Sequence, residues 1–289
     1  GVQTCVLPIW IARPVDPTWE PAVLAKWMYQ SLSPEKRFGM YFEKVNGSDI
    51  PLVTGALGAN YHTYAEALGV DVFAGFAASK ALFDENGAVC GVQIGDMGID
   101  KNGEPGPNFA PGPEIRAKTT IFAEGSRGSV TKQLIAKYAL DAECSPQTYG
   151  LGFKELWQLP EGRVEPGLIS HTIGFPVDAH TYGGSFVYHL NDNRVYVGYV
   201  AGLDYKDPRF KPFEAFQQFK NHPSVRPLLE GGEILTYGAR TIAAGGYQSL
   251  PKTEMPGAML VGCTAGLVNL PKVKGVHQAI RSGVLAAEH

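Results

Sequence analysis

Backbone groups, more than reactive side chains, carry the clearest chemical signal near the end of this sequence. Residues 256–288 read PGAMLVGCTAGLVNLPKVKGVHQAIRSGVLAAE. The apolar run 258–261 predicts a buried strand, the small residues 263–266 a tight turn, and 267–274 a loop. From Gly275 onward, apolar residues recur at helical spacing. Such an arrangement can point N–H groups at an anionic or electron-rich ligand, although an ordinary α/β crossover has the same pattern.

A second candidate element is the motif Ala123-Glu124-Gly125. It stands at the end of a predicted buried strand, 119–123, and SRGS then leads into a predicted helix over 130–138. Before it come a helix, a strand, a hairpin and a loop. This order resembles that of flavoproteins of the glutathione-reductase type, in which an acidic-Gly-x-x-Ser element closes the sheet on the cofactor.

The elements that lead up to this motif are predicted from their turn residues. The run Asp84-Glu85-Asn86-Gly87 supplies the positive-φ pair of a hairpin. Residues 98–112 are polar and rich in glycine and proline, and they predict a loop. The other predicted elements are a helix at 64–68 ending at Gly69, and strands at 70–76, from 81 to 83, and at 89–94.

The middle of the chain changes character. Alternating segments predict strands at 148–156, 168–173, 185–190 and 195–200, with turns at 181–184 and 191–193. A helix with an aromatic face is predicted at about 212–221. The expected structure is a mostly antiparallel sheet inserted into a flavin domain, where such enzymes place the substrate. Residues 10–60 are rich in tryptophan and proline and predict only one helix, at about 21–32. This aromatic tract could form a surface that contacts lipid, or it could pack in the core.

Composition excludes several functional classes. The 289 residues carry a net charge of −3, which gives no electrostatic case for nucleic acid. Cys5, Cys90, Cys144 and Cys263 lack the spacing of a zinc or iron–sulfur ligand set. No run of eighteen apolar residues and no signal peptide is evident. The first nine residues, GVQTCVLPI, resemble a translated adapter and are excluded from fold reasoning.

Several longer runs identify a family. They are AEALGVDVFAGFAA, TIFAEGSRGS, SPQTYGLGFKELW, HTYGGSFVYHL, HPSVRPLLEGG and the terminal GCTAGLVNLPKVKGVHQAIRSGVLAAE. From about residue 65 onward the chain resembles the electron transfer flavoprotein–ubiquinone oxidoreductases. The resemblance implies an oxidoreductase that takes electrons from reduced electron transfer flavoprotein and passes them through a [4Fe–4S] cluster and FAD to ubiquinone. It also implies monotopic association with a bacterial or mitochondrial inner membrane.

The resemblance assigns roles to particular residues. Gly183 and Gly184, with Tyr182 beside them, match the backbone contacts to the quinone head group. A glycine pair lets the main chain approach a flat ring, although the residues alone favour a hairpin turn and only the resemblance reverses this. Of the histidines, His180 is the nearest in sequence to this pair and could deliver protons or serve only the turn.

The FAD residues implied by the resemblance lie in the two motifs described first. They are Ala123, Glu124, Gly125, Gly262, Cys263, Gly266, Gly275 and Val276. The helix that starts at Gly275–Val276 is expected to point its N-terminus at the flavin. For Cys263 both a redox role and simple packing remain open.

The expected fold is mixed α/β: a partial glutathione-reductase-type FAD domain (60–146 and 238–289) with an inserted quinone-binding domain (147–237), after a poorly matched segment, 1–59. No strand–GxGxxG–helix is present. We therefore expect a chain truncated at both ends and of marginal stability, with the cluster cysteines and membrane helix of the family beyond it. Two alternatives stay open: another FAD-dependent oxidoreductase (a hydroxylase or isoprenoid reductase), and a flavin-free fold fragment.

Overall fold

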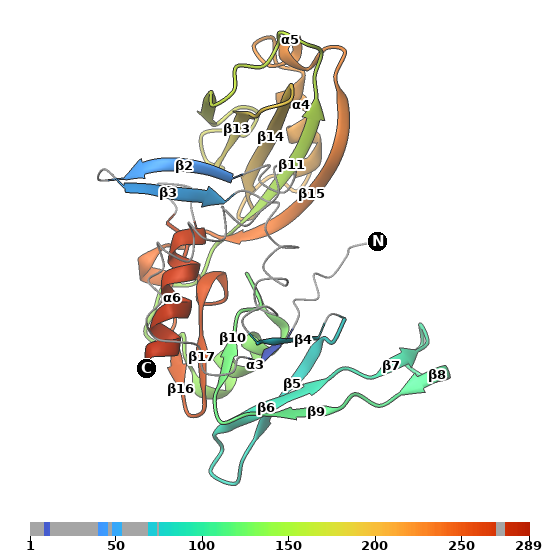
Figure 1. The fold of residues 1–289 in the computed structure, drawn as a ribbon, viewed down its shortest axis with the longest axis vertical. Helices are drawn as coiled ribbons and strands as arrows, with labels where there is room; N and C mark the ends of the chain where they lie inside the picture. Colours follow the sequence, from blue (N-terminus) through green and yellow to red (C-terminus); the bar gives the residue numbers. More distant parts are fainter. Residues whose placement is uncertain (1–8, 12–39, 46–47, 54–68, 74, 270–274) are drawn as a thin grey trace. The chain divides into compact units, whose positions relative to one another are not determined.

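The computed structural model describes residues 9–11, 40–45, 48–53, 69–73, 75–269 and 275–289 (Figure 1). The chain divides into two compact units. Unit 1 comprises residues 1–143 and 251–289, and unit 2 comprises residues 144–250. The helices predicted at 21–32 and 64–68 lie outside the described residues. The exact domain bounds expected from the sequence stay a prediction, and each unit is described here by itself.

Unit 1 contains a three-stranded sheet that joins segments far apart in the sequence. Strand β10 (Thr120–Phe122) pairs in parallel with β17 (Ala258–Leu260), which pairs antiparallel with β16 (Glu254–Met255). Helix α3 (Ser129–Tyr138) follows β10, and helix α6 (Val276–Glu288) ends the chain. The strand–turn–helix patterns predicted at both places are confirmed.

The segment between residues 78 and 116 forms antiparallel strands. Strand β5 (Ala78–Phe83) and β6 (Val89–Ile94) form the predicted hairpin, and β9 (Glu114–Arg116) pairs with β6 on its other side. The side chain of Asp84 accepts hydrogen bonds from the N–H groups of Asn86 and Ala88 in the turn (2.9 and 2.8 Å). The hairpin turn is therefore fixed by local hydrogen bonds, as its residue types predicted.

The loop predicted at 98–112 is wrong in part, because two strands lie there. Strand β7 (Met97–Ile99) pairs antiparallel with β8 (Pro105–Ala110). The carboxylate of Asp100 accepts from the N–H groups of Asn102 and Glu104 (2.8 and 2.9 Å), and so closes the hairpin. Turn-forming residues dominate the composition of this segment and concealed the two short strands.

Two further pairs of strands are described in unit 1. Strand β1 (Ile9–Ile11) pairs antiparallel with β4 (Asp71–Phe73), and β2 (Met40–Val45) pairs antiparallel with β3 (Ser48–Val53). Strand β4 is shorter than the predicted 70–76 strand, because Gly75 takes a positive φ of 84°. Buried apolar side chains of β5, β6, β10, α3 and β17 form the core of unit 1.

Unit 2 is one five-stranded antiparallel sheet in the order β12-β13-β14-β11-β15. The bounds are β11 (Tyr149–Gln158), β12 (Ile169–Ile173), β13 (Gly183–His189), β14 (Arg194–Gly202) and β15 (Glu233–Ala243). The mostly antiparallel sheet predicted for the middle of the chain is confirmed. Strand β15, which the sequence pattern did not predict, pairs with β11 along its length.

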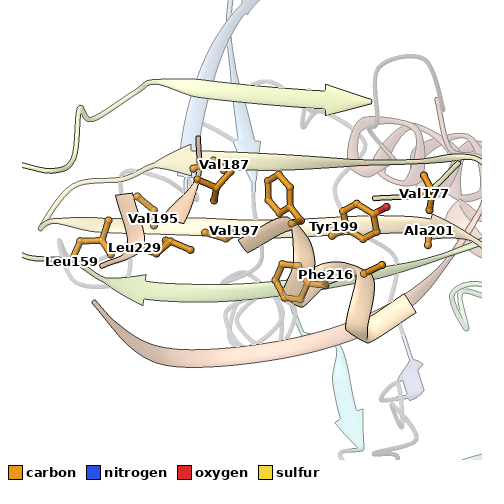
Figure 2. Packing of buried hydrophobic residues seen from close by; sticks show 12 residues of the cluster. Leu159, Val177, Val187, Val195, Val197, Tyr199, Ala201, Phe216 and Leu229 are labelled. Carbon is orange, nitrogen blue, oxygen red and sulfur yellow. The ribbon is translucent and has the colours of Figure 1, made fainter. Parts of the chain in front are cut away.

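Helix α4 (Pro212–Lys220) and the short helix α5 (Arg226–Leu229) supply residues that pack against this sheet (Figure 2). Phe216 and Phe219 of α4 are buried, whereas Phe213 is 56% exposed. Val195, Val197, Tyr199 and Ala201 add alternate positions of β14 to this core, and its other members are Leu159, Val177, Val187, Ala215, Val225 and Leu229. Helix α4 thus packs against one face of the sheet in unit 2.

Candidate functional site

The residues expected to contact FAD gather at the carboxyl ends of two neighbouring parallel strands. Phe122 of β10 pairs with Leu260 of β17, and the N–H of Val261 donates to the Phe122 carbonyl (3.1 Å). Ala123 and Gly262 therefore continue from adjacent strands of one sheet. The carboxyl edge of parallel strands is where ligands bind in α/β sheets.

The glycine-rich turn after β17 is a short 3-10 helix, η3 (Gly262–Thr264), packed against α6. Gly262 has φ +59°, and a Cβ at this position would lie 3.1 Å from that of Ala279. A Cβ at Gly275 would lie 3.6 Å from the Cys263 sulfur. The structure thus brings Gly262, Cys263 and Gly275 together, although thirteen positions separate the first from the last.

The N-terminus of α6 has no side-chain cap, because its N-cap residue is Gly275. The partial positive charge of a helix start therefore remains available to a negatively charged group. In the turn beside it, the Thr264 hydroxyl is buried and has no hydrogen-bond partner among the residues that the structure describes. Both features fit a polar ligand at this edge of the sheet, so the residues present are compatible with the flavin end of FAD.

Glu124 has a role inside the protein in addition to the flavin contact that the motif implied, which stays a prediction. Its carboxylate accepts from the N–H groups of Val130 and Thr131 (3.1 and 2.7 Å) and from the Thr131 hydroxyl (2.5 Å). The donors lie in the first turn of α3, where backbone N–H groups have no partner within the helix. Glu124 thus supplies their acceptor and places a negative charge at the positive end of the helix dipole. These hydrogen bonds fix the conformation of the motif. Ala123 is exposed, and Gly125 turns the chain with φ +77°.

The expected quinone residues lie at the start of strand β13 in unit 2. Gly183 and Gly184 are strand residues that pair with Ala201 and Val200 of β14, so the turn predicted at 181–184 is wrong for these two positions. A Cβ at Gly184 would overlap the Thr172 carbonyl oxygen. At Gly183 it would lie 2.8 Å from a methyl group of Val177. Strand packing alone therefore requires glycine at both positions.

The surface beside the glycine pair is apolar and open. Ile173, which pairs with Gly184, is 94% exposed, and Phe175 and Tyr182 are 52% and 46% exposed. Contact between large apolar side chains and water is energetically unfavourable. A cluster of such exposed side chains therefore indicates a contact surface. Partial burial raises the pKa of the Tyr182 hydroxyl, which keeps it neutral.

His180 belongs to a local turn on this surface. The Asp178 carboxylate accepts from the N–H groups of His180 and Thr181 (3.0 and 2.8 Å). Hydrogen bonds from Thr181 and then from His180 lower the pKa of Asp178. The His180 side chain itself is exposed. Its role in proton delivery stays a prediction.

Tyr199 is a site residue that sequence reasoning missed. It is fully buried on β14, and its hydroxyl donates to the Gly174 carbonyl (3.3 Å). The same hydroxyl lies 3.4 Å from the place that a Cβ of Gly183 would occupy. Burial raises the pKa of Tyr199 to about 12. Only the alternation of β14 could have indicated an inward side chain here.

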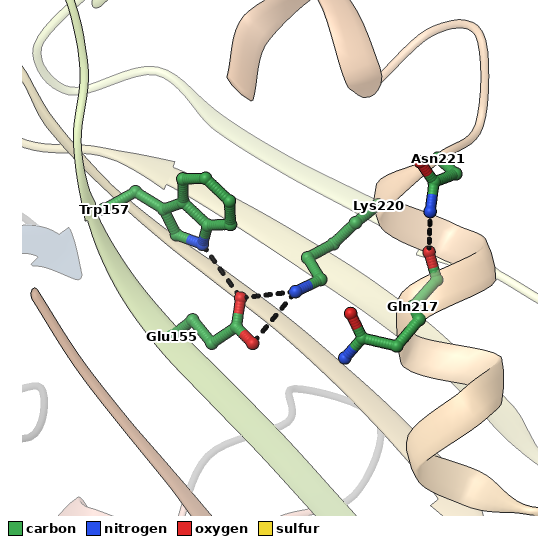
Figure 3. A network of polar contacts seen from close by, with 5 residues as sticks. All are labelled: Glu155, Trp157, Gln217, Lys220 and Asn221. Carbon is green, nitrogen blue, oxygen red and sulfur yellow. Dashed lines mark hydrogen bonds and ion pairs between the residues drawn. The ribbon is translucent and has the colours of Figure 1, made fainter. Parts of the chain in front are cut away.

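A pocket of about 270 Å³ lies between α4, α5 and β11 in unit 2. At its base Lys220 donates to both carboxylate oxygens of Glu155 (2.9 and 2.8 Å), and the indole N–H of Trp157 donates to one of them (2.9 Å) (Figure 3). Arg226 at the rim faces Glu230 (3.5 Å). Each cation is paired with a carboxylate, so the pocket offers no unbalanced charge to a ligand.

The fold defines a class of protein. The chain is similar to a geranylgeranyl bacteriochlorophyll reductase-like protein from Thermoplasma acidophilum, with 21% identity, a TM-score of 0.64, and coverage of 88% of this chain and 58% of that one. It is also similar to a flavin-dependent brominase, with 13% identity, a TM-score of 0.58, and coverage of 92% and 64%. The fold is that of the FAD-dependent oxidoreductases of the glutathione-reductase type.

The sequence comparisons find similar proteins of one name. Residues 149–242 match the family model described as "ETF-QO, ubiquinone-binding". The chain is 48% identical to the mitochondrial electron transfer flavoprotein–ubiquinone oxidoreductase of Homo sapiens, over 88% of this chain and 44% of that protein. With the Dictyostelium discoideum protein of the same name the identity is 52%, over 78% and 37%. The resemblance carried by the sequence motifs is confirmed, and the chain spans less than half the length of these relatives.

Neither a metal site nor a membrane-spanning helix is found among the described residues. No three histidine, cysteine or acidic side chains in the described ranges are grouped so that they could hold a metal ion. Within the same ranges, no helix is long and apolar enough to cross a bilayer.

Proposed function

We propose that this chain carries the ubiquinone-binding part, and part of the FAD-binding domain, of an oxidoreductase that passes electrons from reduced electron transfer flavoprotein to ubiquinone. The observation that carries the proposal is the position of the family match. It begins with Tyr149, the first residue of β11, and ends at Ile242 in β15, so it covers the whole sheet of unit 2.

The surface at the start of β13 suits a quinone. Ubiquinone combines a flat head group that accepts hydrogen bonds with a long apolar tail. The backbone at Gly183–Gly184 has no side chain to keep a flat ring away, and exposed Ile173, Phe175 and Tyr182 supply apolar contacts beside it. We propose that the head group lies against the glycine pair and the tail on these side chains.

The FAD contacts belong to the same proposal. FAD supplies an electron carrier between a protein donor and a quinone. Gly262 and Gly266 would leave room for it beside β17, and the uncapped start of α6 at Gly275–Val276 would stabilise negative charge on it by about 0.3–1 kcal/mol. Cys263 would lie beneath it, held near Gly275.

Partners and location follow from this chemistry. Ubiquinone is a membrane lipid, so we propose that the protein works at a membrane surface with electron transfer flavoprotein as the donor. A [4Fe–4S] cluster is proposed for the whole protein only, because the described part of this chain shows no ligand set for it.

The direct test uses the purified chain and a short-chain ubiquinone. Quenching of tryptophan fluorescence in a titration should saturate with a micromolar Kd, and yellow flavin absorbance should copurify with the chain. Failure to bind quinone would contradict the proposal. Flavin-dependent oxidation of NADPH without electron transfer flavoprotein would favour the hydroxylase or reductase class, and a colourless chain that does not bind quinone would favour a flavin-free fold.

A further inference from the structure

Residues 174–182 form the loop between β12 and β13, here called the 174–182 loop. Both the N–H and the carbonyl group of its first residue, Gly174, form hydrogen bonds. The Gly174 N–H donates to the Gly183 carbonyl (3.0 Å), and the Gly174 carbonyl accepts from the Tyr199 hydroxyl (3.3 Å). At the other end the Gly202 N–H donates to the Tyr182 carbonyl (2.6 Å). The loop is thus anchored to β14 at both ends.

We propose that Tyr199 is a positioning residue for the quinone: its hydroxyl holds the 174–182 loop against the start of β13, so that Phe175 and Tyr182 frame the Gly183–Gly184 backbone. The inference rests on the proposed function and adds a residue to that site. It differs from a contact residue, because Tyr199 would act through Gly174 and would not touch the quinone.

The rest of the Tyr199 side chain makes it a rigid anchor. The ring is fully buried in the unit 2 core and stacks on Phe219 of α4, with centroids 6.1 Å apart and planes at 27°. A buried ring with fixed neighbours has little rotamer freedom, so its hydroxyl occupies one place at little further entropy cost. The raised pKa keeps this hydroxyl protonated at neutral pH and therefore a donor.

Besides Gly174, the Tyr199 hydroxyl has a hydrogen bond with the backbone of Val177, which opposes the effect of burial on its pKa, but the turn at 178–181 closes without Tyr199. The Asp178 carboxylate closes its own turn through the N–H groups of His180 and Thr181. Loss of the Tyr199 hydroxyl should therefore loosen the loop at Gly174 and leave the 178–181 turn intact. This difference between two parts of one loop separates a positioning role from a general loss of stability.

The experiment compares Tyr199→Phe with two controls. Tyr196→Phe removes another hydroxyl from β14, on the opposite face of the sheet, and Val195→Ala removes buried core atoms at the far end of β14. For each variant we measure the Kd for short-chain ubiquinone by fluorescence quenching, the thermal melt, and amide hydrogen exchange of residues 173–183.

Tyr199→Phe should raise the Kd threefold to tenfold, as expected for the loss of one neutral hydrogen bond. Exchange at Gly174 should be faster, while exchange at His180 and Thr181 is unchanged. Val195→Ala should lower the melting temperature and leave the Kd unchanged. An unchanged Kd in Tyr199→Phe, or an equal loss of affinity in Val195→Ala, would overturn the inference. If the unaltered chain does not bind quinone, the proposed function itself fails.

Discussion

The carboxylate of Glu124 shows how one side chain can shape a ligand-binding motif from inside. It accepts two backbone N–H groups and one hydroxyl at the start of α3, and a Cβ at Gly128 would overlap it. The Ala123-Glu124-Gly125 backbone is therefore held at the end of β10 by its own helix. The acidic side chain is therefore needed at this position to cap α3, independently of any ligand that binds to the motif.

Glu124→Gln should lower the free energy of unfolding by about 1–2 kcal/mol, because an amide brings no negative charge to the helix start and accepts with one oxygen only. Chemical denaturation measures the change. Glu143→Gln is the matched control, since its carboxylate is 79% exposed and faces Lys252 at 3.5 Å. An equal loss in both variants would show that Glu124 is not a cap.

His189 is a buried histidine at the end of β13, and its Nδ1 accepts from the N–H of Glu165 (3.0 Å). Burial lowers its pKa, against a smaller opposing effect of Glu165. The unfolded chain therefore takes up a proton near pH 6.5 before the folded chain does. This contribution to stability is complete above pH 6.5 and is lost as the pH falls below it.

His189→Asn should make thermal stability less dependent on pH between 7 and 5, because an asparagine oxygen can still accept from Glu165 but cannot titrate. Melting temperatures of both proteins across this range test the prediction. The exposed His180 gives a control in His180→Asn, which should keep the original slope. Parallel curves for all three proteins would count against a buried neutral His189.

Helix α4 is fixed to the sheet by a buried ion pair as well as by apolar packing. The side chains of Lys220 and Glu155 are only 11% and 7% exposed, and Lys220 also lies over the rings of Phe216 and Trp157 (4.9 and 5.4 Å). A buried pair is costly to break, because the remaining Glu155 charge loses its ion-pair partner and, with only the Trp157 N–H left to it, has little access to water.

Lys220→Met should therefore lower the free energy of unfolding by about 3–5 kcal/mol. Adding Glu155→Gln should restore much of this loss, since no unpaired charge then remains. Lys211→Met is the control at the other end of α4, where the pair with Glu214 is exposed, and it should cost less than about 0.5 kcal/mol. Denaturation curves measure all three; a double variant as unstable as Lys220→Met would refute the explanation.

Elements with a strong local signal could be predicted from the sequence. The hairpin at 84–87 has an aspartate that bonds its own turn, and β17 and α6 follow a clear change of hydrophobic period. Strand β15 could not be predicted, because most of its side chains are exposed and its pairing with β11 is set by residues some eighty positions away. The β7–β8 hairpin was hidden by its own turn residues.

The candidate site likewise contains some residues whose positions could be predicted from the sequence and others whose positions could not. The places of Gly262, Cys263 and Gly275 in the chain follow from the strand–turn–helix pattern, and the structure brings them together as expected. The strand position of Gly183–Gly184 depends on the neighbours Thr172 and Val177, which no local pattern reveals. Tyr199 acts through Gly174, twenty-five positions away, and only a three-dimensional structure could show that contact.

At the scale of the whole molecule, the two units divide the proposed work. In the proposed function, the flavin would bind at the edge of β10 and β17 with the start of α6 in unit 1, and the quinone would bind at the start of β13 in unit 2. The family match on unit 2 makes quinone binding there the central claim.

Photoaffinity labelling with an azido-ubiquinone, followed by peptide mapping, tests this claim most directly. The label should fall on residues 173–184, and excess short-chain ubiquinone should prevent it. Labelling confined to other parts of the chain, or labelling that competing quinone does not reduce, would contradict the account.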